Sequence, residues 1–218
     1  MSDRRDAAIR VAVVDDHELV AEALERAILA HPRIHFVGHA GTAAAGFMLV
    51  QAAQPDIVVM DLKLPDGSGV DVTRAIKAAF PAIDVVMLTG FADGATLANA
   101  LEAGCAGFVS KAGRFDELLA TIEAVHEGQV RVPQGLLEGL VTHLRPRSAA
   151  VGTDLTVRER EVLRLLADGL STSEMMEHLI VSIHTVRNHI RNLLTKLHAS
   201  SRLEAVAVAT RAGLIERS

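Results

Sequence analysis

The segment Ile57-Val58-Val59-Met60-Asp61-Leu62-Lys63-Leu64-Pro65-Asp66-Gly67 decides the fold class of this 218-residue chain. Four apolar residues run without a polar interruption and end at Asp61, and the Pro-Asp-Gly sequence that follows has the chemistry of a turn. A strand that is apolar at every position is typical of a parallel sheet covered on both faces. The segment therefore predicts a buried strand whose carboxyl end carries an aspartate.

The same pattern recurs through the first half of the chain, where short apolar runs alternate with segments of helical spacing. The other expected strands are Ile9–Val14, Ile34–Val37, Val85–Leu88 and Gly107–Val109, and the expected helices cover residues 19–28, 43–51, 70–79, 95–103 and 115–126. Alternating strands and helices predict a doubly wound α/β domain. We expect a flavodoxin-like, five-stranded parallel sheet in residues 1–128.

The second half is different, because everything after Leu155 has the pattern of short helices. Three Ser/Thr-x-x-Glu sequences predict capping boxes, and two glycines stand where left-handed helix ends are expected. The boxes are Thr156/Glu159, Ser171/Glu174 and Ser201/Glu204, the glycines are Gly169 and Gly213, and the helices are Val157–Asp168, Thr172–Leu179, Ile183–His198 and Arg202–Ala212. We expect a small all-α domain in residues 154–218, preceded in residues 129–153 by a connecting helix (Gln134–Leu144) and a linker.

The overall composition is that of a globular protein. Hydrophobic residues make up 50% of the chain and charged residues 22%, which is typical of folded domains. No apolar run approaches the roughly 20 residues of a membrane span, and the charged start of the chain lacks the apolar region of a signal peptide. Cys105 is the single cysteine, so no internal disulfide forms and a reducing compartment is favoured. We expect a cytoplasmic protein without a membrane partner, and a buried Cys105.

The net charge of −5 is divided unevenly along the chain. Residues 1–144 hold 11 Lys and Arg against 19 Asp and Glu, which gives −8, whereas residues 145–218 hold 11 against 8, which gives +3. A mildly basic half is able to accept nucleic acid, whereas an acidic half repels it. This difference alone is explained equally well by ordinary scatter of surface charge.

Polar residues stand at the carboxyl ends of four of the five expected strands. They are Asp15-Asp16, Asp61, Thr89 and Lys111, and in an open parallel sheet these ends form the reactive edge. Converging carboxylates need a cation, and hard oxygen ligands with an open face suit Mg²⁺. Lys111 and Thr89 supply donors for phosphoryl oxygens, and Asp61 is the expected nucleophile. A single aspartate at a strand end is usually a helix cap, but the combination favours a phosphoryl-transfer site.

The expected helix Ile183–His198 has two distinct faces. Val186, Ile190, Leu193, Leu194 and Leu197 form an apolar stripe, whereas His184, Arg187, Asn188, Arg191, Asn192 and Lys196 fall largely elsewhere. Arginine and asparagine are the side chains that read guanine and adenine edges, and they also contact phosphates. Taken alone, this helix is more simply explained by a solvated basic face.

The first half resembles the receiver domain of two-component response regulators over residues 10–128. The resemblance is carried by Asp15-Asp16, by the sequence MDLKLPDG at residues 60–67, by Thr89-Gly90 and by Phe108-Val109-Ser110-Lys111. It implies that Asp61 is the phosphoacceptor, that Asp16 and Asp61 bind Mg²⁺ directly with Asp15 assisting through water, and that the backbone carbonyl of Lys63 completes the metal site. It also implies that Phe108 is the switch aromatic, which turns inward as Thr89 closes on the phosphoryl group.

The second half resembles the LuxR-type helix-turn-helix, and the whole chain resembles regulators of the NarL/FixJ class. The matching segments are residues 155–163, 169–171, 182–189 and 196–197. By this resemblance Ile183–His198 enters the major groove, with Arg187, Asn188 and Arg191 at base edges and Ser182, Thr185 and Lys196 on the DNA backbone. Helix Arg202–Ala212 would be the dimer surface.

Two residue pairs of the second half depart from the family pattern. Met175-Met176 replaces a usual Ile-Ala pair, which puts the angle between the two motif helices in doubt. Thr172-Ser173 replaces a usual Asn-Lys pair, and the lost cation should weaken phosphate contact.

The expected function is that of a DNA-binding response regulator. A sensor histidine kinase would phosphorylate Asp61, and the phosphorylated chain would bind promoter DNA as a homodimer, with RNA polymerase as a further partner if it activates. No enzymatic activity is expected beyond slow self-dephosphorylation. One alternative is a haloacid-dehalogenase-type hydrolase, but that class has Asp-x-Asp after the first strand, where this chain has Asp15-Asp16-His17. The other alternative is a receiver that signals through protein contact alone.

Overall fold

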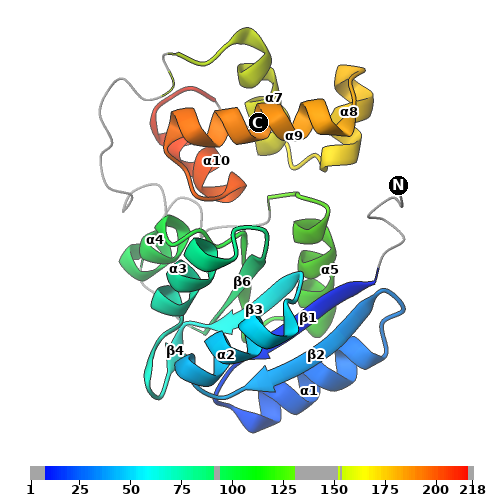
Figure 1. The fold of residues 1–218 in the computed structure, drawn as a ribbon, viewed down its shortest axis with the longest axis vertical. Helices are drawn as coiled ribbons and strands as arrows, with labels where there is room; N and C mark the ends of the chain where they lie inside the picture. The colour runs from blue at the N-terminus through cyan, green and yellow to red at the C-terminus, as the bar shows by residue number, and fades with distance from the viewer. Residues whose placement is uncertain (1–7, 91–93, 131–151, 153, 216–218) are drawn as a thin grey trace.

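The protein consists of an α/β unit followed by a helical unit (Figure 1). A computed structural model describes residues 8–90, 94–130, 152 and 154–215. The predicted connecting helix Gln134–Leu144 and most of the predicted linker lie outside these residues. None of the helices in the described part of the chain is both long and apolar enough to cross a membrane.

The α/β unit contains one five-stranded parallel sheet. Its strands are β1 (Ile9–Val14), β2 (Ile34–Ala40), β3 (Ile57–Asp61), β6 (Asp84–Thr89) and β7 (Gly107–Ser110), in the order β2-β1-β3-β6-β7. This order confirms the flavodoxin-like prediction, and β3 is the central strand. The carboxyl ends of β1, β3, β6 and β7 therefore meet along one edge.

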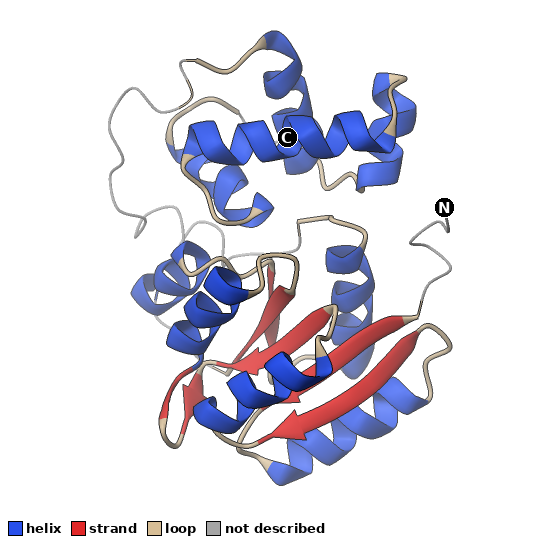
Figure 2. Ribbon diagram, viewed as in Figure 1, coloured by secondary structure: helices blue, strands red, loops and turns tan. Residues whose placement is uncertain are grey.

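Helices cover both faces of the sheet (Figure 2). The helices are α1 (Glu18–Leu29), α2 (Ala43–Ala53), α3 (Gly69–Ala79), α4 (Gly94–Glu102) and α5 (Phe115–His126). Successive side chains of a strand point to opposite faces. Val58 and Met60 of β3 thus pack in the core under α2, α3 and α4, whereas Ile57 and Val59 pack in the core under α1 and α5. This double burial explains why the strand is apolar at every position before Asp61.

The segment after β3 is a small hairpin where the sequence predicted only a loop. Strands β4 (Lys63–Leu64) and β5 (Gly67–Ser68) pair antiparallel around the Pro-Asp turn. The Asp66 carboxylate accepts hydrogen bonds from the backbone N–H groups of Ala43 (2.6 Å) and Ala44 (3.1 Å) at the start of α2. These bonds hold the pKa of Asp66 below its usual value and fix the hairpin beside Asp61.

The helical unit contains α7 (Val157–Ala167), α8 (Thr172–Leu179), α9 (Ile183–Leu197) and α10 (Arg202–Arg211), each ending one residue before the predicted bound or at it. The Thr156 and Ser171 capping boxes are present, and Gly169 and Gly213 have positive φ as predicted.

The third predicted capping box is only half formed. Ser201 Oγ accepts from the Glu204 N–H (3.1 Å), but the Glu204 carboxylate accepts from the N–H of Ser200 (2.6 Å), one residue before the cap. The cap residue has an extended backbone (φ −146°), and the preceding N–H is the one that reaches the carboxylate.

Met175 and Met176, which stand where the resembled pattern has Ile-Ala, pack in and against the core of the helical unit. Met175 is fully buried, and Met176 is half-buried at the edge of the same cluster. The flexible thioether side chain suits such an irregular gap.

The two units contact each other through the starts of α8 and α10. Arg202 Nη1 donates to the Gly128 carbonyl (2.6 Å) and to Thr172 Oγ1 (3.0 Å), and the Thr172 N–H donates to the Glu127 carbonyl (3.2 Å). Leu203 of α10 is fully buried in the apolar cluster that α4 also joins. The helical unit is therefore docked on α4 and on the end of α5.

Gly69 lies against the backbone at the end of the central strand, and substituting it tests how tightly the two segments pack. A Cβ at Gly69 would collide with the carbonyl oxygen of Asp61, whereas a Cβ at Gly67 would meet only the Ala43 side chain at 3.4 Å. Gly69→Ala should lower the free energy of unfolding by about 1–3 kcal/mol, as overpacking does, and Gly67→Ala should change it little. Urea denaturation of both variants checks this, and equal destabilisation would contradict it.

Candidate functional site

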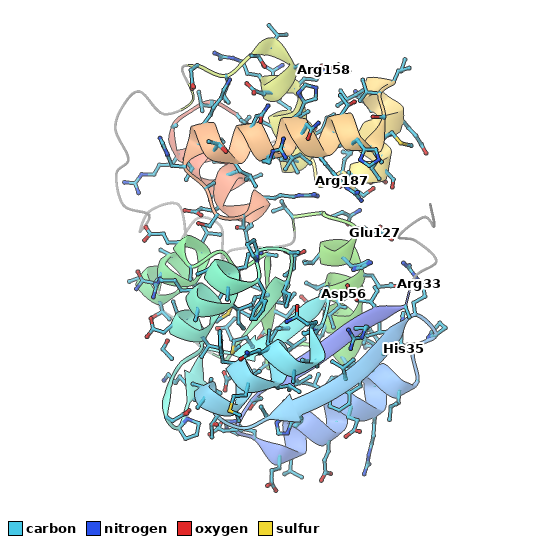
Figure 3. The ribbon with its side chains drawn as sticks, viewed as in Figure 1. Arg33, His35, Asp56, Glu127, Arg158 and Arg187 are labelled. Atoms are coloured by element: carbon cyan, nitrogen blue, oxygen red, sulfur yellow. The ribbon has the colours of Figure 1, made fainter. Side chains whose placement is uncertain are left out.

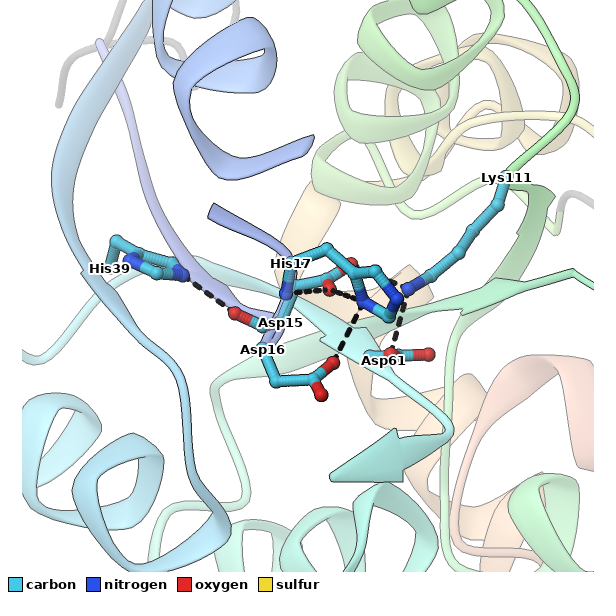
Figure 4. A network of polar contacts seen from close by, with 6 residues as sticks. All are labelled: Asp15, Asp16, His17, His39, Asp61 and Lys111. Atoms are coloured by element: carbon cyan, nitrogen blue, oxygen red, sulfur yellow. Dashed lines mark hydrogen bonds and ion pairs between the residues drawn. The ribbon is translucent and has the colours of Figure 1, made fainter. Parts of the chain in front are cut away.

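An acidic pocket lies at the carboxyl ends of β1 and β3 (Figure 4). Asp15, Asp16, His17 and Asp61 each place a possible ligand atom within 4.8 Å of the others. Asp15 (0% exposed) and Asp61 (5%) are buried, whereas Asp16 and His17 are exposed. The structure thus brings together the three carboxylates that the sequence singled out.

Lys111 closes the inner side of this pocket. Its Nζ lies 2.7 Å from Asp15 Oδ2 and 2.7 Å from Asp61 Oδ2, and the N–H of Lys111 donates to the Thr89 carbonyl (2.8 Å), which fixes the residue at the end of β7. Burial lowers the pKa of Lys111, but the two carboxylates outweigh it and leave the pKa above its usual value. Lys111 is therefore the permanent cation between two buried carboxylates.

Two histidines, which the sequence analysis did not assign, hold Asp15 in place. The His17 N–H donates to Asp15 Oδ1 (2.9 Å), and His17 Nδ1 lies 2.9 Å from the same oxygen and 2.8 Å from Asp16 Oδ1. Nε2 of His39, in β2, lies 2.7 Å from the Asp15 carbonyl oxygen. The position of His17 directly after Asp15-Asp16 could have indicated its contact with the acid pair. His39 is distant from the pair in sequence, so its contact had no such signal.

The pocket fits a divalent cation. Its three carboxylates supply hard oxygen donors on one side of the sheet edge, which is the donor set that such a cation prefers. Lys63 begins the hairpin two residues after Asp61, and the hairpin leaves the sheet at this same edge. The acidic pocket is therefore typical of a divalent metal site.

Thr89 and Phe108 occupy neighbouring strands beside the pocket. Thr89 ends β6, the strand that pairs with β3, and is 6% exposed. The Phe108 ring is 1% exposed and packs in the core between the sheet and α4. In this structure the aromatic ring is turned inward.

Helix α9 is amphipathic in the way the sequence predicted. Val186, Ile190, Leu193 and Leu197 are buried, whereas Arg187, Asn188 and Arg191 are exposed. Ser182 Oγ caps the helix by accepting from the Thr185 N–H (3.2 Å), and the two hydroxyl oxygens are 2.9 Å apart.

Lys196 is held inside the helical unit. Its Nζ donates to the Asp154 carbonyl (3.0 Å) and to Glu159 Oε2 (2.8 Å). Burial raises the pKa of Glu159, but the hydrogen bonds from Lys196 and Thr156 outweigh it and leave the pKa lowered. The predicted contact of Lys196 with a DNA backbone competes with this ion pair.

Part of the exposed face of α9 is turned toward the α/β unit. Arg187, Ile190 and Arg191 line a cavity whose far wall includes Glu127 and Gly128 at the end of α5. Figure 3 shows Arg187 in the space between α9 and Glu127. Two of the three residues predicted to reach base edges are thus directed at the partner unit in this arrangement.

Comparison with known families assigns both units. The family described as "Response regulator receiver domain" matches residues 11–123, and that described as "Bacterial regulatory proteins, luxR family" matches residues 153–209. The chain belongs to the response regulators. It combines a receiver domain with a LuxR-type DNA-binding domain, as the sequence predicted.

Curated relatives share this organisation over almost their whole length. The chain is 33% identical over 216 residues to the probable transcriptional regulatory protein NarL of Mycobacterium tuberculosis (strain CDC 1551 / Oshkosh), covering 99% of this chain and all of the relative. It is 32% identical over 206 residues to the DNA-binding transcriptional activator DevR/DosR of Mycobacterium tuberculosis (strain ATCC 25618 / H37Rv), covering 93% and 94%. The crystal structure of the response regulator ChrA, from a heme-sensing two-component system, aligns with a TM-score of 0.53 at 28% identity, covering 96% of this chain and all of that one.

The ionised form of Asp15 should make folding depend on pH. Burial raises the pKa of Asp15, but hydrogen bonds from Lys111 and His17 bring it below its ordinary value of 3.8. A carboxyl group whose pKa falls on folding adds stability above its unfolded pKa and loses it as the pH falls toward the folded pKa. Without divalent cations, the stability of the wild type should therefore fall below pH 3.8 more steeply than that of Asp15→Asn.

Urea denaturation across this pH range measures the difference. Asp71→Asn is a matched control, because Asp71 is an exposed carboxylate on the surface of α3 whose one ion-pair partner within the described residues is Arg74. Asp71→Asn should follow the wild type, and an acid limb of Asp15→Asn as steep as that of the wild type would contradict the expectation.

Proposed function

We propose that this regulator accepts a phosphoryl group on Asp61 from a sensor histidine kinase in the cytoplasm. The observation that carries the proposal is the position of Asp61. Asp61 is the last residue of the central strand and is 5% exposed. Its Oδ2 lies 2.7 Å from Lys111 Nζ, and the carboxylates of Asp15 and Asp16 are beside it. Phosphoryl transfer needs a positioned nucleophile and charge neutralisation, and these residues supply both.

Mg²⁺ is the cation that best suits this pocket. Asp16 and Asp61 would bind it directly, with Asp15 assisting through water and the Lys63 carbonyl completing the set. When bound, Mg²⁺ neutralises the charge that gathers on the phosphoryl oxygens during transfer. The chain itself otherwise only holds and releases the phosphoryl group, so we propose no enzymatic activity beyond slow self-dephosphorylation.

Phosphorylation would redistribute the charges around Lys111. An aspartyl phosphate carries new oxygens and roughly two negative charges in place of the single charge of the carboxylate, so Lys111 and the Thr89 hydroxyl are drawn toward it. Helix α4 begins at Gly94, five residues after Thr89, and packs against α10 of the other domain. A rearrangement at Thr89 therefore reaches the docked DNA-binding domain through α4.

The output is binding of promoter DNA by a homodimer. Arg187, Asn188 and Arg191 would contact base edges, and Ser182 and Thr185 at the start of α9 would contact the DNA backbone, with Lys196 joining them if it leaves Glu159. The exposed Arg and Asn side chains on α9 support this, as does the 32% identity to a relative named a DNA-binding transcriptional activator. Because Arg187 and Arg191 face the receiver domain here, phosphorylation would act by releasing α9. If the regulator activates, RNA polymerase is a further partner.

Phosphoacceptance is tested directly with acetyl phosphate. The wild type incubated with acetyl phosphate and Mg²⁺ should gain one phosphoryl group in its intact mass, and Asp61→Asn should gain none because a neutral amide replaces the nucleophilic carboxylate. Asp71→Asn, which keeps the pocket intact, should behave as the wild type, and a chelator should prevent labelling. Labelling of Asp61→Asn would show that another residue is the acceptor.

DNA binding is tested by gel shift on the DNA upstream of the gene, with phosphorylated protein. Affinity should fall steeply with salt, because binding of a polyanion releases counterions. Arg187→Ala should weaken binding by roughly 10–100-fold, the cost of a lost base-edge contact. Arg164→Ala, an exposed arginine of α7, should change it less than about twofold. If no salt-dependent shift is seen, the alternative of signalling through protein contact alone is favoured.

A further inference from the structure

A cavity of about 510 Å³ lies between the receiver domain and the DNA-binding domain. One wall is α9 with the first turns of α8 and α10, and the other is the end of α5 with the loop after α3. Its volume is within the range of roughly 300–1,000 Å³ that small-molecule sites occupy. Neither the acidic pocket nor the apolar contact of α10 with α4 accounts for it.

The lining of this cavity carries unbalanced positive charge. Its two carboxylates, Asp84 and Glu127, are already directed at receiver cations, Lys77 (3.4 Å) and Arg33 (3.7 Å) respectively. Arg187 and Arg191 also line the cavity, and neither guanidinium group makes a hydrogen bond or ion pair within the described part of the chain. Two exposed guanidinium groups one helical turn apart therefore line a partly open cavity.

The helix ends around the cavity are already compensated. The first turns of α8 and α10 line it, but the carboxylates of Glu174 and Glu204 in these turns accept the N–H groups of Ser171 and Ser200. At the end of α5 the Glu127 carbonyl accepts from the Thr172 N–H, and the Gly128 carbonyl accepts from Arg202. The preference of the cavity for an anion therefore comes from Arg187 and Arg191.

We propose that the cavity binds a small oligophosphate, a soluble molecule with two or more adjacent phosphate groups. Guanidinium groups bind phosphate oxygens through paired, charge-assisted hydrogen bonds, and Arg187 and Arg191 are spaced to share one such ligand. Pro81, Ile190 and Leu194 add apolar lining, which accommodates an organic part of the ligand. A DNA duplex does not enter a space of this volume, so the ligand is a small molecule.

The ligand would hold the regulator in its docked arrangement. It contacts both domains, so its binding stabilises the state in which they are together. It also occupies Arg187 and Arg191, which makes its binding and DNA binding mutually exclusive. This competition between the ligand and DNA rests on the proposed DNA-binding function, whereas the binding of the ligand itself does not.

Binding is measured by calorimetry, with pyrophosphate titrated into the unphosphorylated full-length chain. A chelator is present throughout, so that no Mg²⁺ carries pyrophosphate to the acidic pocket. We expect one saturable site, weakened by roughly tenfold or more in Arg187→Ala and in Arg191→Ala, because each removes a charge-assisted pair. Arg164→Ala, which removes an arginine outside the cavity, should bind within about twofold of the wild type.

A second pair of variants tests whether the site lies between the domains. Ala82 lines the cavity from the receiver side and is exposed, so Ala82→Glu adds a negative charge to the wall opposite α9. Ala82→Glu should bind pyrophosphate at least about threefold more weakly than the isosteric Ala82→Gln. Equal affinity of these two variants, or an equal loss in Arg164→Ala and Arg187→Ala, would overturn the proposal, as would the absence of a saturable site in the wild type.

The competition is tested separately by gel shift at constant ionic strength, with chloride replacing pyrophosphate in the control. Pyrophosphate should lower DNA affinity of the wild type and leave that of Ala82→Glu less affected. Saturable binding without this competition would overturn the regulatory part alone, whereas a wild type that binds pyrophosphate but no DNA would contradict the proposed function and leave the ligand site standing.

Discussion

The pair of 2.7 Å contacts from Lys111 to Asp15 and Asp61 is the interaction on which the pocket depends. Two carboxylates buried side by side repel each other, and burial of an uncompensated charge is costly. Lys111 compensates both from inside the sheet edge, while His17 contacts Asp15 and Asp16 from the solvent side. The charges of Asp15 and Asp61 are therefore partly compensated by residues of the chain itself, and Asp16 beside them is exposed.

The burial of β3 on both faces explains why the position of Asp61 is fixed. With Val58 and Met60 in one core and Ile57 and Val59 in the other, the strand has no freedom to shift its register, since a one-residue slip would exchange its two faces. Asp61 is thereby held at a fixed depth. The hairpin that follows is fastened to α2 by Asp66, so the loop nearest the pocket is also fixed.

The sheet order and the gathering of Asp15, Asp16, Asp61 and Lys111 could be predicted, because apolar runs mark parallel strands and parallel strands end at one edge. Contacts between distant segments could not. Nothing in the local sequence of His39 indicates a bond to the Asp15 carbonyl, and capping-box spacing does not reveal that the Glu204 carboxylate binds Ser200 instead of Ser201. The docking of the two domains could not be predicted for the same reason, since Arg202 and Gly128 are distant in the sequence and meet only in the folded chain.

The acidic pocket and helix α9 each gather charges of one sign, but they differ in whether the chain compensates them. At the acidic pocket the Lys111 ammonium lies between the carboxylates of Asp15 and Asp61, so part of their negative charge is compensated within the chain. On α9 the guanidinium groups of Arg187 and Arg191 pair with no carboxylate among the described residues, and Asp84 and Glu127 are directed at Lys77 and Arg33. A surface intended for DNA has to remain uncompensated, since an internal partner would compete with phosphate. When such a surface faces another domain across a partly open cavity, the described residues do not neutralise its charge, and that is the physical reason for the proposed binding of a small anion between the two domains.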